Sequence, residues 1–98
     1  MKYKKLLNMV LNFINSNEDI EIAENFCNEF MENYYNFQED LEQEVTQNIY
    51  ELFDDINIVC DSYESNEKIR EMDKYCIDEI ELRNKVLEIY NRIAQYIC

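Results

Sequence analysis

The chain has 98 residues, with 22 Asp and Glu against 9 Lys and Arg, no His, and a formal net charge of -13. This charge disfavours direct binding to nucleic acid or anionic membranes, which depends on Lys and Arg, and the absence of His excludes mixed Cys/His metal sites and the Glu-x-x-His di-iron site. Apolar residues make up 47% and there is no Gly or Pro, so we expect an ordered, all-α fold and not an all-β one, whose tight turns use Gly and Pro.

Two helices are predicted in the first part of the chain. The first runs from about Lys2 to Asn15, because apolar residues recur there at helical spacing; this favours an amphipathic helix over a signal peptide. The second runs from about Asp19 to Asn36, with Ser16, Asn17 or Asp19 as its possible N-cap. The expected core residues are Tyr3, Leu6, Leu7, Val10, Leu11 and Ile14, then Ile22, Ala23, Phe26, Cys27, Phe30, Met31 and Tyr34.

Two more long helices are predicted in the second part. One runs from about Gln38 to Cys60, and residues 61–75 hold only one or two short helical turns. The last helix begins after Asp78, which has capping-box spacing to Glu81. Four helices with short connections predict an antiparallel four-helix bundle, a single domain over residues 1–98. The expected core residues are Leu41, Val45, Ile49, Leu52, Phe53, Ile56, Val59 and Cys60, then Leu82, Val86, Ile89, Tyr90, Ile93 and Ile97.

No segment reaches the roughly 20 apolar residues that span a bilayer, so we expect a cytoplasmic protein. Cys27, Cys60, Cys76 and Cys98 lack the paired short spacings of a zinc site. Cys27 and Cys60 fall on apolar faces, where a thiol packs as a small hydrophobe. A Cys60–Cys76 bridge would require an oxidising compartment, and Cys98 is expected to be free. We expect neither a metal nor another cofactor.

Charge is distributed unevenly along the chain. From Leu6 to Glu67 there is no Lys, Arg or His, and the bases lie at the N-terminus and in the last third. One interpretation pairs these bases with acids of the second and third helices; the other is a dipolar molecule. Two acidic clusters, Asp54-Asp55 and Asp61 with Glu64 and Glu67, are interpreted as a solvated face, a protein-binding face or, least expected, a metal or catalytic site. If these clusters form an exposed acidic face, they would speed the encounter of the protein with a basic partner.

The aromatic residues favour the core, with three exceptions. Phe26, Phe30, Phe53 and Tyr90 fall on the apolar stripes, whereas Tyr35, Tyr50 and Tyr63 lie off them or at their edges, close to acids. Tyr is enriched in interface hot spots because a rigid ring carries a polar tip. Tyr63 is the strongest interface candidate of the three.

The second half of the chain resembles a family pattern. This pattern comprises the segment Leu52-Phe53-Asp54-Asp55-Ile56-Asn57-Ile58-Val59-Cys60-Asp61, then Arg70, and then Ile77-Asp78-Glu79-Ile80-Glu81-Leu82-Arg83. It is similar to the bacterial self-protective, colicin-like immunity proteins, which include immunity proteins of contact-dependent growth inhibition systems and the colicin D immunity protein. The resemblance implies a small helical bundle that covers the basic active-site cleft of its cognate nuclease toxin, for which we expect a tRNase. It places the toxin-binding residues at Asp54, Asp55, Asp61 and Glu64, with Glu51 and Tyr63 beside them.

Other functions fit the composition less well. A DNA-mimic regulator, which occupies a DNA-binding protein such as a restriction enzyme or a repressor, is the first alternative, and a scaffolding helical subunit is the second. An enzyme is the least expected, because the chain offers no His, no Gly-rich loop and no nucleophile beside a base.

Overall fold

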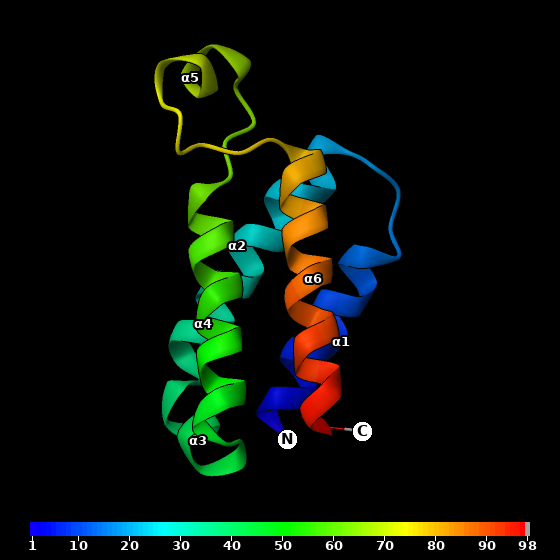
Figure 1. Ribbon diagram of the computed structural model, residues 1–98, viewed down its shortest axis with the longest axis vertical. Coiled ribbons are helices and arrows are strands. Elements are labelled where there is room, and N and C mark those ends of the chain that lie inside the picture. Colours follow the sequence, from blue (N-terminus) through cyan, green and yellow to red (C-terminus); the bar gives the residue numbers. More distant parts are fainter. Residues whose placement is uncertain (98) are drawn as a thin grey trace.

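A computed structural model of the chain describes residues 1–97, and Cys98 lies outside the described residues. The prediction of an all-α fold is confirmed: the described chain forms six helices and no strand (Figure 1). The helices are α1 (Lys2–Ile14), α2 (Ile20–Asn36), α3 (Gln38–Glu44), α4 (Gln47–Ser62), α5 (Glu67–Met72) and α6 (Glu79–Ile97).

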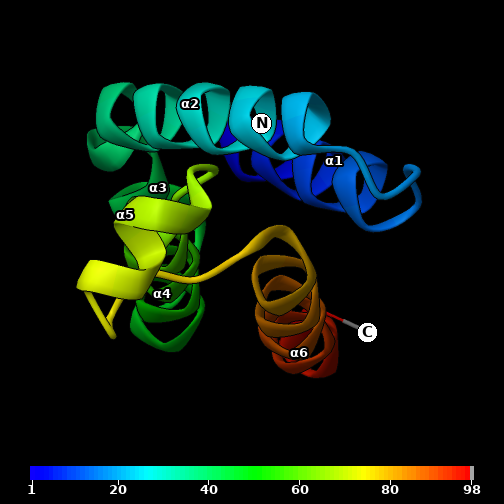
Figure 2. The ribbon, with the colours of Figure 1, turned by 90° about the horizontal axis from the view of Figure 1, so that it is seen from above.

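The four long helices form two layers. Helices α1 and α2 make one pair and α4 and α6 the other, and the helices of each pair run in opposite directions (Figure 1). Figure 2 looks nearly along α4 and α6, while α1 and α2 run across the view, so the two pairs cross. Helix α4 packs against both α2 and α6, and α1 also contacts both of them. None of the helices described for residues 1–97 is long and apolar enough to cross a membrane.

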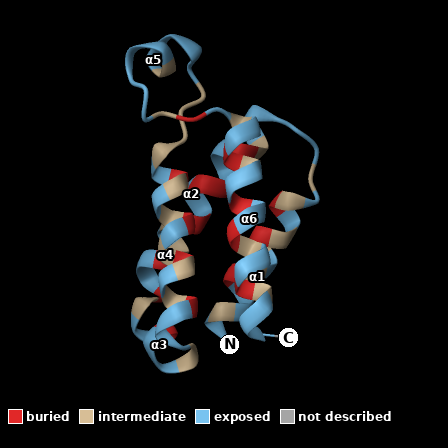
Figure 3. Cartoon of the chain, in the orientation of Figure 1, coloured by how far each residue is buried: buried red, intermediate tan, exposed pale blue. Residues whose placement is uncertain are grey.

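The core lies between the two pairs (Figure 3). Phe26, Phe30 and Phe53 are buried, as the sequence predicts, and Tyr90 is half-buried. Phe13 was not expected in the core, yet it is 2% exposed and stacks on Phe26 with the ring centroids 4.3 Å apart. The fully enclosed large side chains are Phe30, Phe53, Leu6, Leu41, Ile56, Leu82, Ile93, Val10 and Val86.

The prediction of one helix from Gln38 to Cys60 is wrong. The helix is interrupted at Val45 and Thr46, whose backbones are extended, and α4 continues to Ser62. The Thr46 hydroxyl accepts a hydrogen bond from the Ile49 backbone amide at 3.4 Å and so caps α4. The apolar periodicity continues across the break, because residues on both sides of it face the core. The periodicity alone therefore does not reveal the break.

The N-caps of two other helices agree with those predicted from the sequence. The Asp19 carboxylate accepts hydrogen bonds from the amides of Glu21 and Ile22 and caps α2. The Asp78 carboxylate accepts the amide of Glu81 at 2.8 Å at the start of α6. The structure thus selects Asp19 from the three residues predicted as possible caps of α2, and it confirms Asp78 as the cap of α6.

Residues 61–75 hold the end of α4 and the short α5, which projects from one end of the molecule (Figure 1). No residue of α5 is buried. The projection is closed at its base by two backbone hydrogen bonds: the Glu64 amide donates to the Ile77 carbonyl at 3.0 Å, and the Ile77 amide donates to the Ser62 carbonyl at 2.9 Å. The chain therefore enters and leaves the projection beside Tyr63, at the end of α4.

Candidate protein-binding surface

Helices α2, α3 and α4 adjoin in space, and none of them contains Lys or Arg. In the described part of the chain there are two ion pairs, Arg83–Glu79 and Arg92–Glu88, and both lie within α6. The interpretation that the bases pair with acids of the second and third predicted helices is therefore wrong. The acids of α2, α3 and α4 are left without an ion pair among residues 1–97.

The acidic residues predicted on α4 lie on two flanks of the helix. Asp54 faces α2, where its carboxylate accepts a hydrogen bond from the Tyr34 hydroxyl at 2.9 Å. Asp61 lines a cavity with residues of α2. By contrast, Glu51 and Asp55 line a groove with Arg92 of α6. The structure thus brings only part of the predicted set together.

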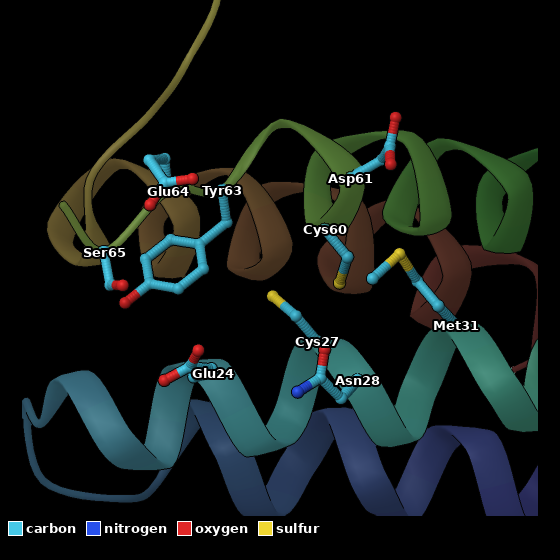
Figure 4. Close-up of a pocket in the computed structure, with 9 residues that line it drawn as sticks. All are labelled: Glu24, Cys27, Asn28, Met31, Cys60, Asp61, Tyr63, Glu64 and Ser65. Carbon is cyan, nitrogen blue, oxygen red and sulfur yellow. The ribbon is translucent and has the colours of Figure 1, made fainter. Parts of the chain in front are cut away.

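An acidic cavity lies between α2 and the end of α4 (Figure 4). Its volume is about 140 Å³. Three acidic residues line it: Glu24 from α2, Asp61 from α4, and Glu64 from the segment after α4. We call Glu24, Asp61 and Glu64 the acidic mouth. The other lining residues are Cys27, Asn28, Met31, Cys60, Tyr63 and Ser65, so no base contributes to the cavity wall.

Tyr63 stands at the centre of this region. Its ring is half-buried, and its hydroxyl donates to the Ile20 carbonyl at 3.5 Å. It lines both the acidic cavity and a neighbouring one of about 260 Å³, to which Arg70 and Glu79 contribute. Burial, and after it the neighbouring Cys27 and Glu24, raises the pKa of Tyr63, so the phenol stays protonated and available as a donor at neutral pH.

Glu64 is held in place by the turn that follows α4. Its carboxylate accepts the amide of Asn66 at 3.0 Å, and its backbone carbonyl accepts a hydrogen bond from the Arg70 guanidinium at 2.6 Å. Arg70 is therefore turned toward the backbone at the base of the α5 projection. The Glu64 side chain has a structural role in this turn in addition to its charge.

The other two off-stripe tyrosines differ in environment. Tyr50 is half-buried, with its ring centroid 6.1 Å from that of Tyr34, whereas Tyr35 is 75% exposed. Burial, and after it the hydrogen bond to Asp54, raises the pKa of Tyr34 above its ordinary value of 10.0. Asp54 is thus engaged within the fold, while Asp61 and Glu24 are exposed.

The flank of α4 that faces α6 has mixed charge. Asp55 lines two grooves there, with Arg92 in both and Lys85 in one. The Glu51 carboxylate accepts a hydrogen bond from the side-chain amide of Gln47 at 3.4 Å. A basic partner would meet bases as well as acids on this flank, so it is the less favourable side of α4 for such a partner.

Glu24 belongs to the site but is absent from the set predicted from the sequence. The sequence did carry a signal for Glu24, because this residue lies in the base-free segment, one turn before Cys27. However, nothing in the sequence shows that α2 and the end of α4 line the same cavity. Cys27, Cys60 and Cys76 are all free thiols, and Cys60 lies beside Cys27. Among residues 1–97, no three or more His, Cys, Asp or Glu residues are grouped so as to hold a metal ion.

No family model matches the chain, and the comparisons with curated proteins and with solved structures also give no match.

Proposed function

We propose that this protein is an immunity-type inhibitor that binds the basic nuclease domain of a cognate toxin and covers its active-site cleft. The expected toxin is a tRNase, the expected compartment is the cytoplasm, and the protein acts as a monomer. We further propose that α1, α2, α4 and α6 act together as an antiparallel four-helix scaffold, built from two crossing pairs, that carries the binding surface. No catalytic residue and no cofactor is assigned.

The observation that carries this proposal is the base-free surface of α2 and α4. The acidic mouth gathers three carboxylates around a cavity whose wall contains no base. A nuclease that cuts RNA must present cationic groups to phosphates, and carboxylates fixed on a folded surface can occupy the same positions. Such complementary charge speeds association and selects the partner.

Tyr63 supplies the anchor that charge alone does not provide. Interface energy concentrates in a few central aromatic or Arg side chains surrounded by polar groups. Tyr63 is half-buried, and it lies between the acidic mouth and the neighbouring cavity. We assign contact with the toxin to Asp61, Tyr63 and Glu64 together with Glu24, and a supporting role to Asp54. Glu51 and Asp55 are assigned to the edge of the interface.

The test begins with a tagged protein used to capture partners from the source cells at low salt, followed by mass spectrometry. The captured protein is then separated from the inhibitor and incubated with tRNA. We expect a basic domain that cleaves RNA when it is separated from the inhibitor, and whose cleavage stops when the inhibitor is added back. A captured nuclease that is unaffected by the inhibitor would contradict it. Capture of a repressor or restriction subunit, displaced by duplex DNA, would instead support the DNA-mimic alternative.

Matched charge reversals locate the surface. Glu24→Lys with Asp61→Lys changes the acidic mouth, whereas Glu42→Lys with Glu88→Lys makes the same change of net charge on α3 and α6. All four side chains are exposed. If the acidic mouth binds the toxin, the first pair slows association by about tenfold or more, and the second pair has a much smaller effect. If both pairs slow association equally, the net charge of the protein and not the acidic mouth determines the association rate.

A further inference from the structure

The cavity of Figure 4 contains two thiols that the proposed function does not use. Cys27 of α2 and Cys60 of α4 are each 2% exposed, and both line the cavity. Figure 4 shows their sulfur atoms in the same space between the two helices, reaching it from opposite sides. The neighbouring Cys27 is also the first cause of the raised pKa of Cys60. Two cysteines whose sulfur atoms share one small space between two helices are a dithiol as well as a packing pair.

We infer that Cys27 and Cys60 form an oxidisable dithiol site, which closes to a disulfide by exchange with a small neutral or cationic disulfide and so joins α2 to α4. This inference is independent of the proposed toxin partner. The chemical class of the oxidant follows from the cavity. Its volume of about 140 Å³ admits only small molecules, and the carboxylates of the acidic mouth repel anionic disulfides.

The exchange consists of two balanced displacements. The thiolate of one cysteine attacks a sulfur of the small disulfide, forms a mixed disulfide and releases one small thiol. The second cysteine, as its thiolate, then attacks the cysteine sulfur of the mixed disulfide and releases the second small thiol. The two cysteine protons are carried by the two released thiols. The protein dithiol is oxidised by two electrons, and the small disulfide is reduced by two.

The surroundings of the pair set its rate. The interaction with the neighbouring Cys27, and after it burial, raises the pKa of Cys60. The ionisable groups that line the cavity are Glu24 from α2, Asp61 from α4, and Tyr63 and Glu64 from the segment after α4, so no lining group stabilises a thiolate. Closure is therefore slow at neutral pH and accelerates as the pH rises.

The sequence makes the product easy to identify. No trypsin site lies between Lys5 and Lys68, so Cys27 and Cys60 fall in one tryptic peptide, residues 6–68. Cys76 falls in the peptide of residues 75–83, and Cys98 in that of residues 93–98. A disulfide between Cys27 and Cys60 therefore stays within one peptide, while any bridge to another cysteine joins two peptides.

The experiment treats the reduced full-length protein with cystamine, a small dicationic disulfide, and follows the intact mass and the non-reducing tryptic map. We expect the loss of two hydrogen atoms, located within the peptide of residues 6–68 and reversed by a reductant. Oxidised glutathione, which is anionic, should react more slowly. Cys76→Ser should close like the wild type, and Cys27→Ser should not form the internal bridge.

Several results would overturn the inference. A bridge that joins the peptide of residues 6–68 to either of the other cysteine peptides would show that the paired thiols are different ones. A mixed disulfide that persists on Cys27 or Cys60 would show that the two sulfurs do not meet, and an unmodified peptide would show that the site is closed to the reagent. The wild-type map decides among these results even if Cys27→Ser fails to fold.

Discussion

The guanidinium of Arg83, on α6, lies over the ring of Phe13 at 4.6 Å from its centroid and also donates a hydrogen bond to the Phe13 carbonyl at 2.7 Å. The same guanidinium donates to the carbonyls of Ile14, Ser16 and Asn17. These carbonyls belong to the last turn of α1 and the connection to α2, where a helix end leaves acceptors without intrahelical donors. Arg83 thus joins both elements to α6.

The first prediction concerns Arg83→Lys. Lysine retains the charge but lacks the planar fork that reaches several acceptors at once. Because this site is largely enclosed, with 13% of the Arg83 side chain exposed, we expect the free energy of unfolding to fall by about 1.5–3 kcal/mol, as is typical for hydrogen bonds to a charged group. Urea denaturation followed by circular dichroism measures the change.

Arg92→Lys is the matched control. Arg92 also pairs with a Glu four residues earlier on α6, but 59% of its side chain is exposed. We expect a change of less than about 0.5 kcal/mol, since exposed pairs contribute little. If the two substitutions have equal effects, the contacts of Arg83 with the α1–α2 connection are not what stabilises this end of the fold.

Helix positions were largely predictable from the sequence, whereas the contacts that join them were not. Apolar periodicity locates α1, α2, α4 and α6, because each long helix buries one stripe. Phe13 lies outside the expected stripe of its helix and is nevertheless buried, because α2 and Arg83 cover its ring. Arg83 itself has ordinary helical spacing to Glu79, so a sequence pattern shows the ion pair but not the backbone acceptors 66 to 70 residues away.

The second prediction concerns the break between α3 and α4. Thr46→Ala removes the hydroxyl that accepts the Ile49 amide, and we expect a loss of about 1 kcal/mol in unfolding free energy. Thr46→Ser retains a hydroxyl cap and should remain within about 0.5 kcal/mol of the wild type. Thermal denaturation of both variants measures the difference. An alanine variant as stable as the serine variant would show that tertiary packing alone determines the break.

The third prediction concerns salt. With a net charge of -13 and two described ion pairs, like charges dominate the surface, and their repulsion favours the unfolded chain. We therefore expect the unfolding free energy to rise with sodium chloride up to about 0.5 M, where the screening length is only a few ångströms. Glu24→Gln with Asp61→Asn should reduce this rise. Stability that is constant across the salt series would contradict the prediction.

The candidate site shows the same limit of sequence reasoning. Charge composition indicated an acidic surface, and the family resemblance placed Asp61 and Glu64 on it, with Tyr63 beside them. Glu24 could not be named, because its place beside them depends on how α2 crosses α4. Conversely, Glu51 and Asp54 are three residues apart on one helix, yet Glu51 lines the groove with α6 and Asp54 bonds to α2.

The last prediction concerns Tyr34 and alkaline pH. The pKa of Tyr34 is raised in the folded state by burial and by its hydrogen bond to Asp54, so the folded protein retains the proton at a pH where the unfolded chain loses it. Stability from this group is therefore complete below about pH 10 and is lost as the pH rises further, by up to about 1.4 kcal/mol per pH unit. The raised pKa values of Tyr63 and Cys60 act in the same direction.

The variant Tyr34→Phe separates the contribution of Tyr34 to the pH dependence of stability from the contributions of Tyr63 and Cys60. At pH 7 we expect a loss of about 1–2 kcal/mol, because the Asp54 carboxylate loses its donor. Above pH 10 the variant should lose stability less steeply than the wild type, so that the difference between them narrows. Tyr35→Phe is the control, since the Tyr35 side chain is 75% exposed, and it should change neither quantity. A Tyr34→Phe curve parallel to that of the wild type from pH 8 to 11 would show that the Tyr34 proton is not linked to folding.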